Sequence, residues 1–130
     1  MRKEQATLLI IEDDSEFLET LVDYLSDLKL TITTAQNGKI GSHLAMNSAF
    51  DCILCDITMP EMHGDEAVNH IRQTPLNSKT PIIILSAYLD NKIVETLSDK
   101  TARIFSKPIN FELLGNTILE QIKKFRQELQ

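Results

Sequence analysis

The chain has 130 residues, which fits a single domain with one hydrophobic core. Its net charge of −6 argues against a nucleic-acid-binding domain, because such domains usually present a basic face. No apolar run approaches the roughly 20 residues of a membrane span, and the first residues lack the apolar stretch of a signal peptide. We therefore expect a cytoplasmic protein that binds neither membrane nor nucleic acid directly.

Short apolar segments alternate with segments of helical periodicity along the chain. Strands are expected at residues 7–11, 30–34, 51–55, 82–85 and 102–106, because these runs are short, apolar and bounded by polar or turn residues. Helices are expected where apolar residues recur every three or four positions, which happens at about 15–28, 39–48, 93–97 and 111–129. A further helix is expected to hold Ala67, Val68 and Ile71.

The first two helices carry more specific expectations. Asp14 or Ser15 can cap the first helix, since each offers a side-chain oxygen to the free N–H groups of the first turn. The second helix has a weaker pattern, in which Ile40, Leu44 and Ala45 are expected to face the core.

The alternation of strands and helices indicates an α/β fold with a parallel sheet covered on both faces. The crossovers between strands are expected to be right-handed. The sequence contains no repeat, low-complexity tract or linker. We therefore expect one domain over residues 1–130, with a core of about 7–125, and no second domain.

Cys52 and Cys55 have the C-x-x-C spacing that suggests redox chemistry or half of a zinc site. Both lie in an expected strand, where residues three apart point to opposite sides of the sheet. The sequence has no second pair of ligands that would complete a zinc site. We interpret both cysteines as small core residues.

Polar side chains stand at the carboxyl ends of four expected strands. They are Glu12, Asp13 and Asp14 after the first strand, Asp56 after the third, Ser86 after the fourth and Lys107 after the fifth. In an open α/β sheet these strand ends share one edge, where ligands bind. Each residue alone has an ordinary explanation as a cap, a turn residue or a solvated side chain, but their joint placement predicts a site.

Such a cluster suits phosphoryl chemistry on a carboxylate. Gathered carboxylates repel one another unless a cation offsets their charge, and their hard oxygens suit Mg²⁺. A carboxylate can also attack phosphorus to give an aspartyl phosphate, a reaction that needs mainly positioning and charge neutralisation. Lys107 would supply a second positive charge.

The sequence resembles the receiver domain of two-component response regulators over about residues 7–125. Four segments carry the resemblance: LLIIEDD at 8–14, CDITMPEMHG at 55–64, LSA at 85–87 and FSKP at 105–108. The D-x-x-M-P-x-M-x-G string is the most specific of them. The resemblance implies a doubly wound (βα)5, flavodoxin-like fold whose five parallel strands lie in the order 2-1-3-4-5.

The resemblance also implies a role for each site residue. Asp56 would accept a phosphoryl group from the phosphohistidine of a histidine kinase or phosphotransfer protein, in a Mg²⁺-dependent reaction. Asp13, Asp56 and the main-chain carbonyl of Thr58 would ligate Mg²⁺, and Glu12 would act mainly through water. Ser86 and Lys107 would contact the phosphoryl group, and the bond before Pro108 would be cis.

Two departures from the family pattern affect the face made by the fourth helix, the fifth strand and the fifth helix. Ile104 stands where the family commonly has a switch Tyr or Phe, and residues 100–103 lack the usual glycine before the fifth strand. The same face has opposite charges that would suit a homodimer: Lys123, Lys124 and Arg126 against Asp90, Glu95 and Asp99. The downstream effector is not indicated.

Three other interpretations fit the sequence less well. A phosphatase or phosphotransferase enzyme that works through an aspartyl phosphate would usually carry a second Asp at the position of Thr58. A flavin-binding protein would need a phosphate loop after the first strand, where this chain is acidic. A receiver used only for docking is disfavoured by the complete set of acid, Ser and Lys. We therefore expect a signalling domain that catalyses its own phosphorylation and dephosphorylation rather than an enzyme with another substrate.

Overall fold

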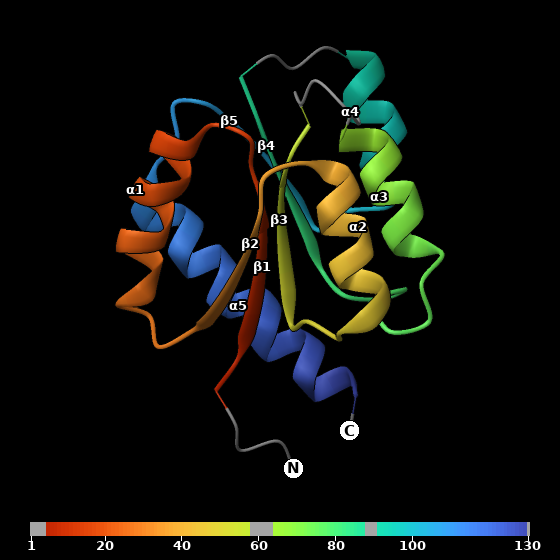
Figure 1. Cartoon of the computed structure of the whole chain (residues 1–130), viewed down its shortest axis with the longest axis horizontal. Coiled ribbons are helices and arrows are strands. Elements are labelled where there is room, and N and C mark those ends of the chain that lie inside the picture. The colour runs from red at the N-terminus through yellow and green to blue at the C-terminus, as the bar shows by residue number, and fades with distance from the viewer. Residues whose placement is uncertain (1–4, 58–63, 88–90, 130) are drawn as a thin grey trace.

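Ten elements alternate along the chain in the computed structural model, which describes residues 5–57, 64–87 and 91–129 (Figure 1). The strands are β1 Thr7–Ile11, β2 Thr31–Ala35, β3 Cys52–Asp56, β4 Ile82–Ser86 and β5 Arg103–Ser106. The helices are α1 Ser15–Ser26, α2 Gly38–Asn47, α3 Gly64–Arg72, α4 Asn91–Leu97 and α5 Phe111–Glu128. The expected sequence of five strand–helix units is therefore confirmed, with boundaries shifted by a few residues at most.

The strands form one parallel sheet in the order β2-β1-β3-β4-β5, as the resemblance implied. Helices cover both faces: α1 and α5 lie on one side, and α2, α3 and α4 on the other (Figure 1). Strands β3 and β4 are buried along their whole length, which explains why their sequences are continuously apolar rather than alternating.

The core consists of two layers, one on each face of the sheet. Side chains along a strand alternate between them, so Leu8 and Ile10 pack on the α1–α5 side while Leu9 and Ile11 pack on the opposite side. Cys52 and Cys55 follow the same rule and are buried in different layers. The prediction that the two cysteines point to opposite sides of the sheet is confirmed.

Among the described residues, side-chain caps begin helices α1, α2 and α5. Asp14 caps α1 by accepting from the N–H groups of Glu16 and Phe17, which confirms one of the two expected caps. Asn37 and Asn110 do the same for α2 and α5. No helix in the described part of the chain combines the length and apolar character that crossing a bilayer requires.

The expectation that Ile40 faces the core is wrong, because that side chain is 45% exposed. The buried residues of α2 are Gly38, Gly41, Ser42 and Ala45, all of them small. A Cβ added at Gly41 would meet the buried side chain of Ile11, with Cγ1 at 2.6 Å. The expectation for Leu44 and Ala45 is confirmed, since Ala45 is buried and Leu44 packs against the core. The helix thus packs close to β1 mainly through small residues, which a pattern based on large apolar residues does not identify.

The expectation that Arg126 faces outward with Lys123 and Lys124 is also wrong. Its Nε and Nη2 atoms donate to Asp51 Oδ1 at 3.2 Å and Oδ2 at 2.8 Å. Asp51 has no exposed surface and also accepts from the backbone N–H of Thr7 at 2.9 Å. The pair therefore fastens the last turns of α5 to the amino ends of β1 and β3.

Candidate functional site

Three carboxylates meet at the carboxyl edge of the sheet. Glu12 and Asp13 follow β1, Asp56 ends β3, and one oxygen from each lies within 4.8 Å of the others. Glu12 and Asp56 are buried, whereas Asp13 is exposed. The neighbouring pairing of β1 with β3 explains the convergence, since both strands end at the same level of the sheet.

Lys107 brings a positive charge to this cluster. Its Nζ lies 3.2 Å from Asp56 Oδ2 and 3.3 Å from Glu12 Oε1, and its side chain is 21% exposed. The backbone N–H of Lys107 donates to the carbonyl of Ser86 at 2.8 Å, so pairing of β5 with β4 continues up to this residue. The bond from Lys107 to Pro108 is cis, as the resemblance implied.

The electrostatics of the site depend on how strongly it is buried. Burial raises the pKa of Glu12 to about 7, and a hydrogen bond to Asp56 and the charge of Asp56 act in the same direction. The N–H of Asp14 and the charge of Lys107 oppose this rise without cancelling it. Burial alone lowers the pKa of Lys107, but the charges of Asp56 and Glu12 outweigh it and the pKa is raised.

The remaining predicted residues lie at or near the same edge. Ser86 is buried at the end of β4, opposite Ser106 in the register with β5. Ile104 is half-buried in β5 and packs on the core layer covered by α2, α3 and α4, while Phe105 points into the other layer. Thr58, expected to offer a main-chain carbonyl, lies outside the described residues.

The donor set fits a hard divalent cation. Glu12, Asp13 and Asp56 offer only oxygen atoms, which is the chemistry that Mg²⁺ prefers. The buried carboxylates of Glu12 and Asp56 lie next to fully buried apolar side chains of β1 and β3. A cation added to the charge of Lys107 would lower the free-energy cost of keeping both carboxylates ionised there. Glu12, Asp13 and Asp56 are thus the residues that could hold the metal.

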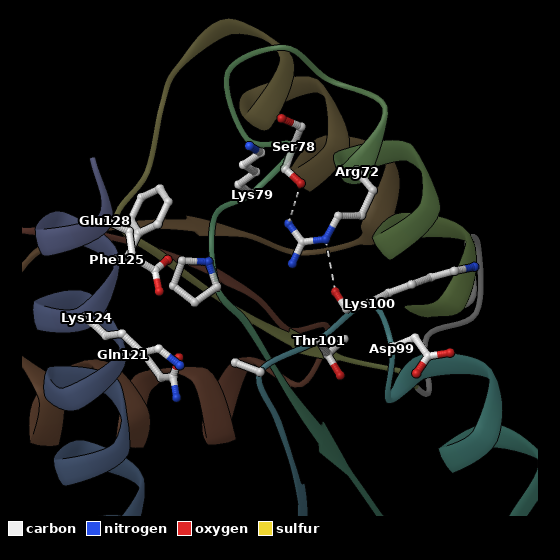
Figure 2. A pocket seen from close by; sticks show the side chains of 12 residues that line it. Arg72, Ser78, Lys79, Asp99, Lys100, Thr101, Gln121, Lys124, Phe125 and Glu128 are labelled. Carbon is white, nitrogen blue, oxygen red and sulfur yellow. Dashed lines mark hydrogen bonds between the residues drawn. The ribbon is translucent and has the colours of Figure 1, made fainter. Parts of the chain in front are cut away.

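A hollow of about 410 Å³ lies at the opposite, amino-terminal edge of β4 and β5 (Figure 2). Arg72 closes one side of it and donates to the carbonyls of Asn77, Ser78, Thr80 and Lys100 at 2.7–3.3 Å. Arg72 therefore ties the loop before β4 to the loop before β5. No sequence pattern indicates this role, because the four acceptors are main-chain atoms.

Sequence reasoning also missed Phe17 as a neighbour of the site. The ammonium of Lys107 lies over its ring, 4.3 Å from the centroid. Phe17 fits the apolar pattern of α1, so it is predicted only as a packing residue. A contact between residues 90 positions apart depends on how α1 sits against the end of β5, which the local sequence does not encode.

Comparison with known proteins decides which family this geometry belongs to. The family model described as response regulator receiver domain matches residues 8–119. The chain is a member of the receiver domain family. The strand order, the acidic cluster and the lysine at the end of β5 stand where the sequence resemblance expected them.

Individual relatives agree with that assignment. The chain is 30% identical over 127 residues to the transcriptional regulatory protein ZraR of Klebsiella oxytoca, covering 97% of the chain and 28% of ZraR. It is 35% identical over 118 residues to a cyclic di-GMP phosphodiesterase of Thermotoga maritima, covering 90% of the chain and 31% of that protein. The chain thus spans about a third or less of these relatives.

A solved structure supports the fold. The response regulator TrrA of Thermotoga maritima, in complex with Mg²⁺ and BeF, superposes with a TM-score of 0.81 at 24% identity. The superposition covers 90% of this chain and 99% of TrrA. At this level of identity the similarity shows the fold alone.

Proposed function

We propose that this receiver domain accepts a phosphoryl group on Asp56 from the phosphohistidine of a histidine kinase or phosphotransfer protein. The observation that carries the proposal is the position of Asp56, a buried carboxylate with Lys107 Nζ at 3.2 Å and two further carboxylates beside it. An isolated turn Asp has no need of such surroundings. A carboxylate poised for attack on phosphorus needs both positive charge and fixed geometry.

The transfer exchanges one bond to phosphorus for another. A carboxylate oxygen of Asp56 forms the new P–O bond as the P–N bond to the donor imidazole breaks, and the imidazole leaves as the neutral base once it holds a proton. Lys107 lies close enough to the carboxylate to pair with the negative oxygens that arrive with the phosphoryl group. Ser86, at the neighbouring strand end, is proposed to hydrogen-bond the same group.

Bound Mg²⁺ would neutralise charge on the phosphoryl oxygens and on the carboxylates. Glu12, Asp13 and Asp56 would hold it, with Glu12 acting mainly through water. The main-chain carbonyl of Thr58 is proposed as a further ligand. The positive charges of Lys107 and the metal together would allow the buried carboxylates of Glu12 and Asp56 to remain ionised during transfer.

We also propose that phosphorylation acts through the α4-β5-α5 face. Ile104 occupies the position of the usual aromatic switch there, and it is half-buried against the core layer covered by α2, α3 and α4. Lys123, Lys124, Glu95 and Asp99 on this face are exposed and of opposite sign, which suits a homodimer, whereas Arg126 is engaged by Asp51. Asp90, the third acidic residue expected on this face, lies outside the described residues. Sedimentation of the protein with and without beryllofluoride tests the dimer: a monomer under both conditions contradicts it.

The decisive experiment is phosphorylation by a small donor. The chain is incubated with phosphoramidate and Mg²⁺, and the gain of one phosphate is followed by intact mass. Asp56→Asn is expected to abolish the gain, because an amide is a poor nucleophile and a poor Mg²⁺ ligand. Asp23→Asn, which removes the same charge from an exposed position on α1, is the matched control and should react normally. Stoichiometric phosphate on the Asp56→Asn protein would show that the acceptor is another residue.

A further inference from the structure

The ring of Phe17 forms one side of the place that Lys107 Nζ occupies. The ammonium lies 4.3 Å from the ring centroid, while its other neighbours are Asp56 Oδ2 at 3.2 Å and Glu12 Oε1 at 3.3 Å. A cation over the face of an aromatic ring is attracted by the ring's negative quadrupole. Because the Lys107 side chain is only 21% exposed, this attraction acts where water is largely excluded.

Phe17 is held in place by the acidic turn itself. Its backbone N–H donates to Asp14 Oδ1 at 3.2 Å, and the N–H of Asp14 donates to Glu12 Oε2 at 3.1 Å. The other oxygen of Glu12 contacts Lys107 Nζ. These contacts form a closed circuit, which runs from Glu12 through Asp14 and Phe17 to Lys107 and back to Glu12.

We propose that Phe17 is a positioning residue for phosphoryl transfer, which holds the Lys107 ammonium beside Asp56 through the face of its ring. The role rests on the function proposed above. A lysine side chain has several rotatable bonds, so holding its ammonium in one place loses conformational entropy. This loss reduces the free energy gained when the ammonium pairs with the phosphoryl oxygens. An aromatic ring that confines the ammonium before phosphorylation means that this entropy is already lost in the unphosphorylated protein, as it is for other preorganised electrostatic groups in catalysis.

Ordinary truncation of Phe17 cannot by itself separate this role from packing. Phe17 packs against the core layer under α1 and α5, and its ring centroid lies 6.3 Å from that of Phe111. Phe17→Ala would therefore leave a cavity as well as remove the ring. Fluorination of the ring avoids the difficulty, since it weakens the negative face in steps while the shape changes little.

The experiment replaces Phe17 with 4-fluoro-, 3,5-difluoro- and 3,4,5-trifluorophenylalanine through a recoded codon in the full chain. The initial rate of phosphorylation by phosphoramidate in saturating Mg²⁺ is expected to fall with each added fluorine, to about one-fifth in the trifluoro protein, the loss of roughly 1 kcal/mol of cation–π attraction. Phe17→Tyr should keep most of the rate, and Phe17→Leu should lose at least as much as the trifluoro ring. The same fluorinated residues at Phe111, which packs in the same core layer but has no contact with the Lys107 ammonium among the described contacts, should leave the rate unchanged.

A second measurement separates this role from the proposed function. The ε protons of Lys107 should show an upfield ring-current shift in the NMR spectrum, lost in Phe17→Leu and kept in Phe17→Tyr. Normal phosphorylation at one rate across the fluorinated series, or the absence of the ring-current shift, would overturn the role of Phe17 while leaving Asp56 as the acceptor. Failure of the unmodified chain to gain phosphate would instead overturn the proposed function, and with it the role of Phe17.

Discussion

Binding of Mg²⁺ should release a proton from the protein below neutral pH, and Glu12 should be its source. Burial and the neighbouring Asp56 raise the pKa of Glu12 to about 7 in the metal-free protein. A pKa of 7 means that this carboxyl is ~0.9 protonated at pH 6 and only ~0.03 protonated at pH 8.5. A divalent cation at the cluster favours the ionised form, so the proton must leave as the metal binds.

The size of the effect follows from these fractions. Mg²⁺ affinity should fall ~10-fold between pH 8.5 and pH 6, or ~1.4 kcal/mol, as Glu12 becomes protonated. Titration calorimetry at pH 6 in two buffers of different ionisation enthalpy should report ~0.9 protons released per metal, against almost none at pH 8.5. Glu12→Gln, which cannot ionise, is the control and should lose most of this proton release.

The same pKa has a consequence for folding that tests the reasoning without metal. The pKa of Glu12 is raised above its ordinary value of 4.5, so its contribution to stability is complete below pH 4.5 and is lost as the pH rises through 7. The metal-free protein should therefore be up to ~2.5 kcal/mol less stable to urea at pH 8 than at pH 5 on account of this group, and Glu12→Gln should make stability depend less on pH in this range. The raised pKa of Glu12 would be refuted by two results together. The unsubstituted protein would release no protons on binding Mg²⁺ at pH 6, and its free energy of unfolding would depend on pH as it does in Glu12→Gln.

Two further changes test the packing. Gly41→Ala should destabilise the protein by ~1–3 kcal/mol, because the new methyl group meets the buried Ile11, whereas Gly115→Ala should be close to neutral, since its neighbour Leu28 Cδ1 at 3.2 Å can move and alanine favours the helix. Urea unfolding of both proteins measures the difference, and equal effects would contradict the close approach of α2 to β1. Arg126→Ala should cost ~3–5 kcal/mol by leaving Asp51 buried without its guanidinium, and a loss below ~1 kcal/mol in the same assay would show that the pair contributes little.

The sequence predicted the sheet and the site for one physical reason. Parallel strands buried on both faces must be continuously apolar, so each strand and its polar carboxyl end stand out in the sequence, and the topology then brings Glu12, Asp13, Asp56 and Lys107 to one edge. This prediction needs no knowledge of side-chain contacts.

The errors share a different cause. Ile40 was expected inside because it is large and apolar, but α2 packs through glycine, serine and alanine, whose inward placement is decided by the space next to Ile11. Arg126 and Arg72 were not recognised because their partners, a buried carboxylate and four main-chain carbonyls, are far away in sequence or invisible in it. The local pattern identifies which residues are apolar, whereas long-range polar partners depend on the finished fold.

Because Cys52 and Cys55 are buried in separate layers, their rates of chemical labelling can report how often each side of the sheet unfolds locally. Burial raises the pKa of the Cys52 thiol to about 12 and raises that of Cys55 as well, so neither supplies a reactive thiolate while its layer is closed. Modification by a water-soluble thiol reagent must therefore wait for a structural opening. Because one sulfur lies under α1 and α5 and the other under α2, α3 and α4, the two labelling rates compare how often each side of the sheet becomes exposed. Equal rates would mean that the domain opens as one unit, and a faster rate at either cysteine would name the side that loosens first.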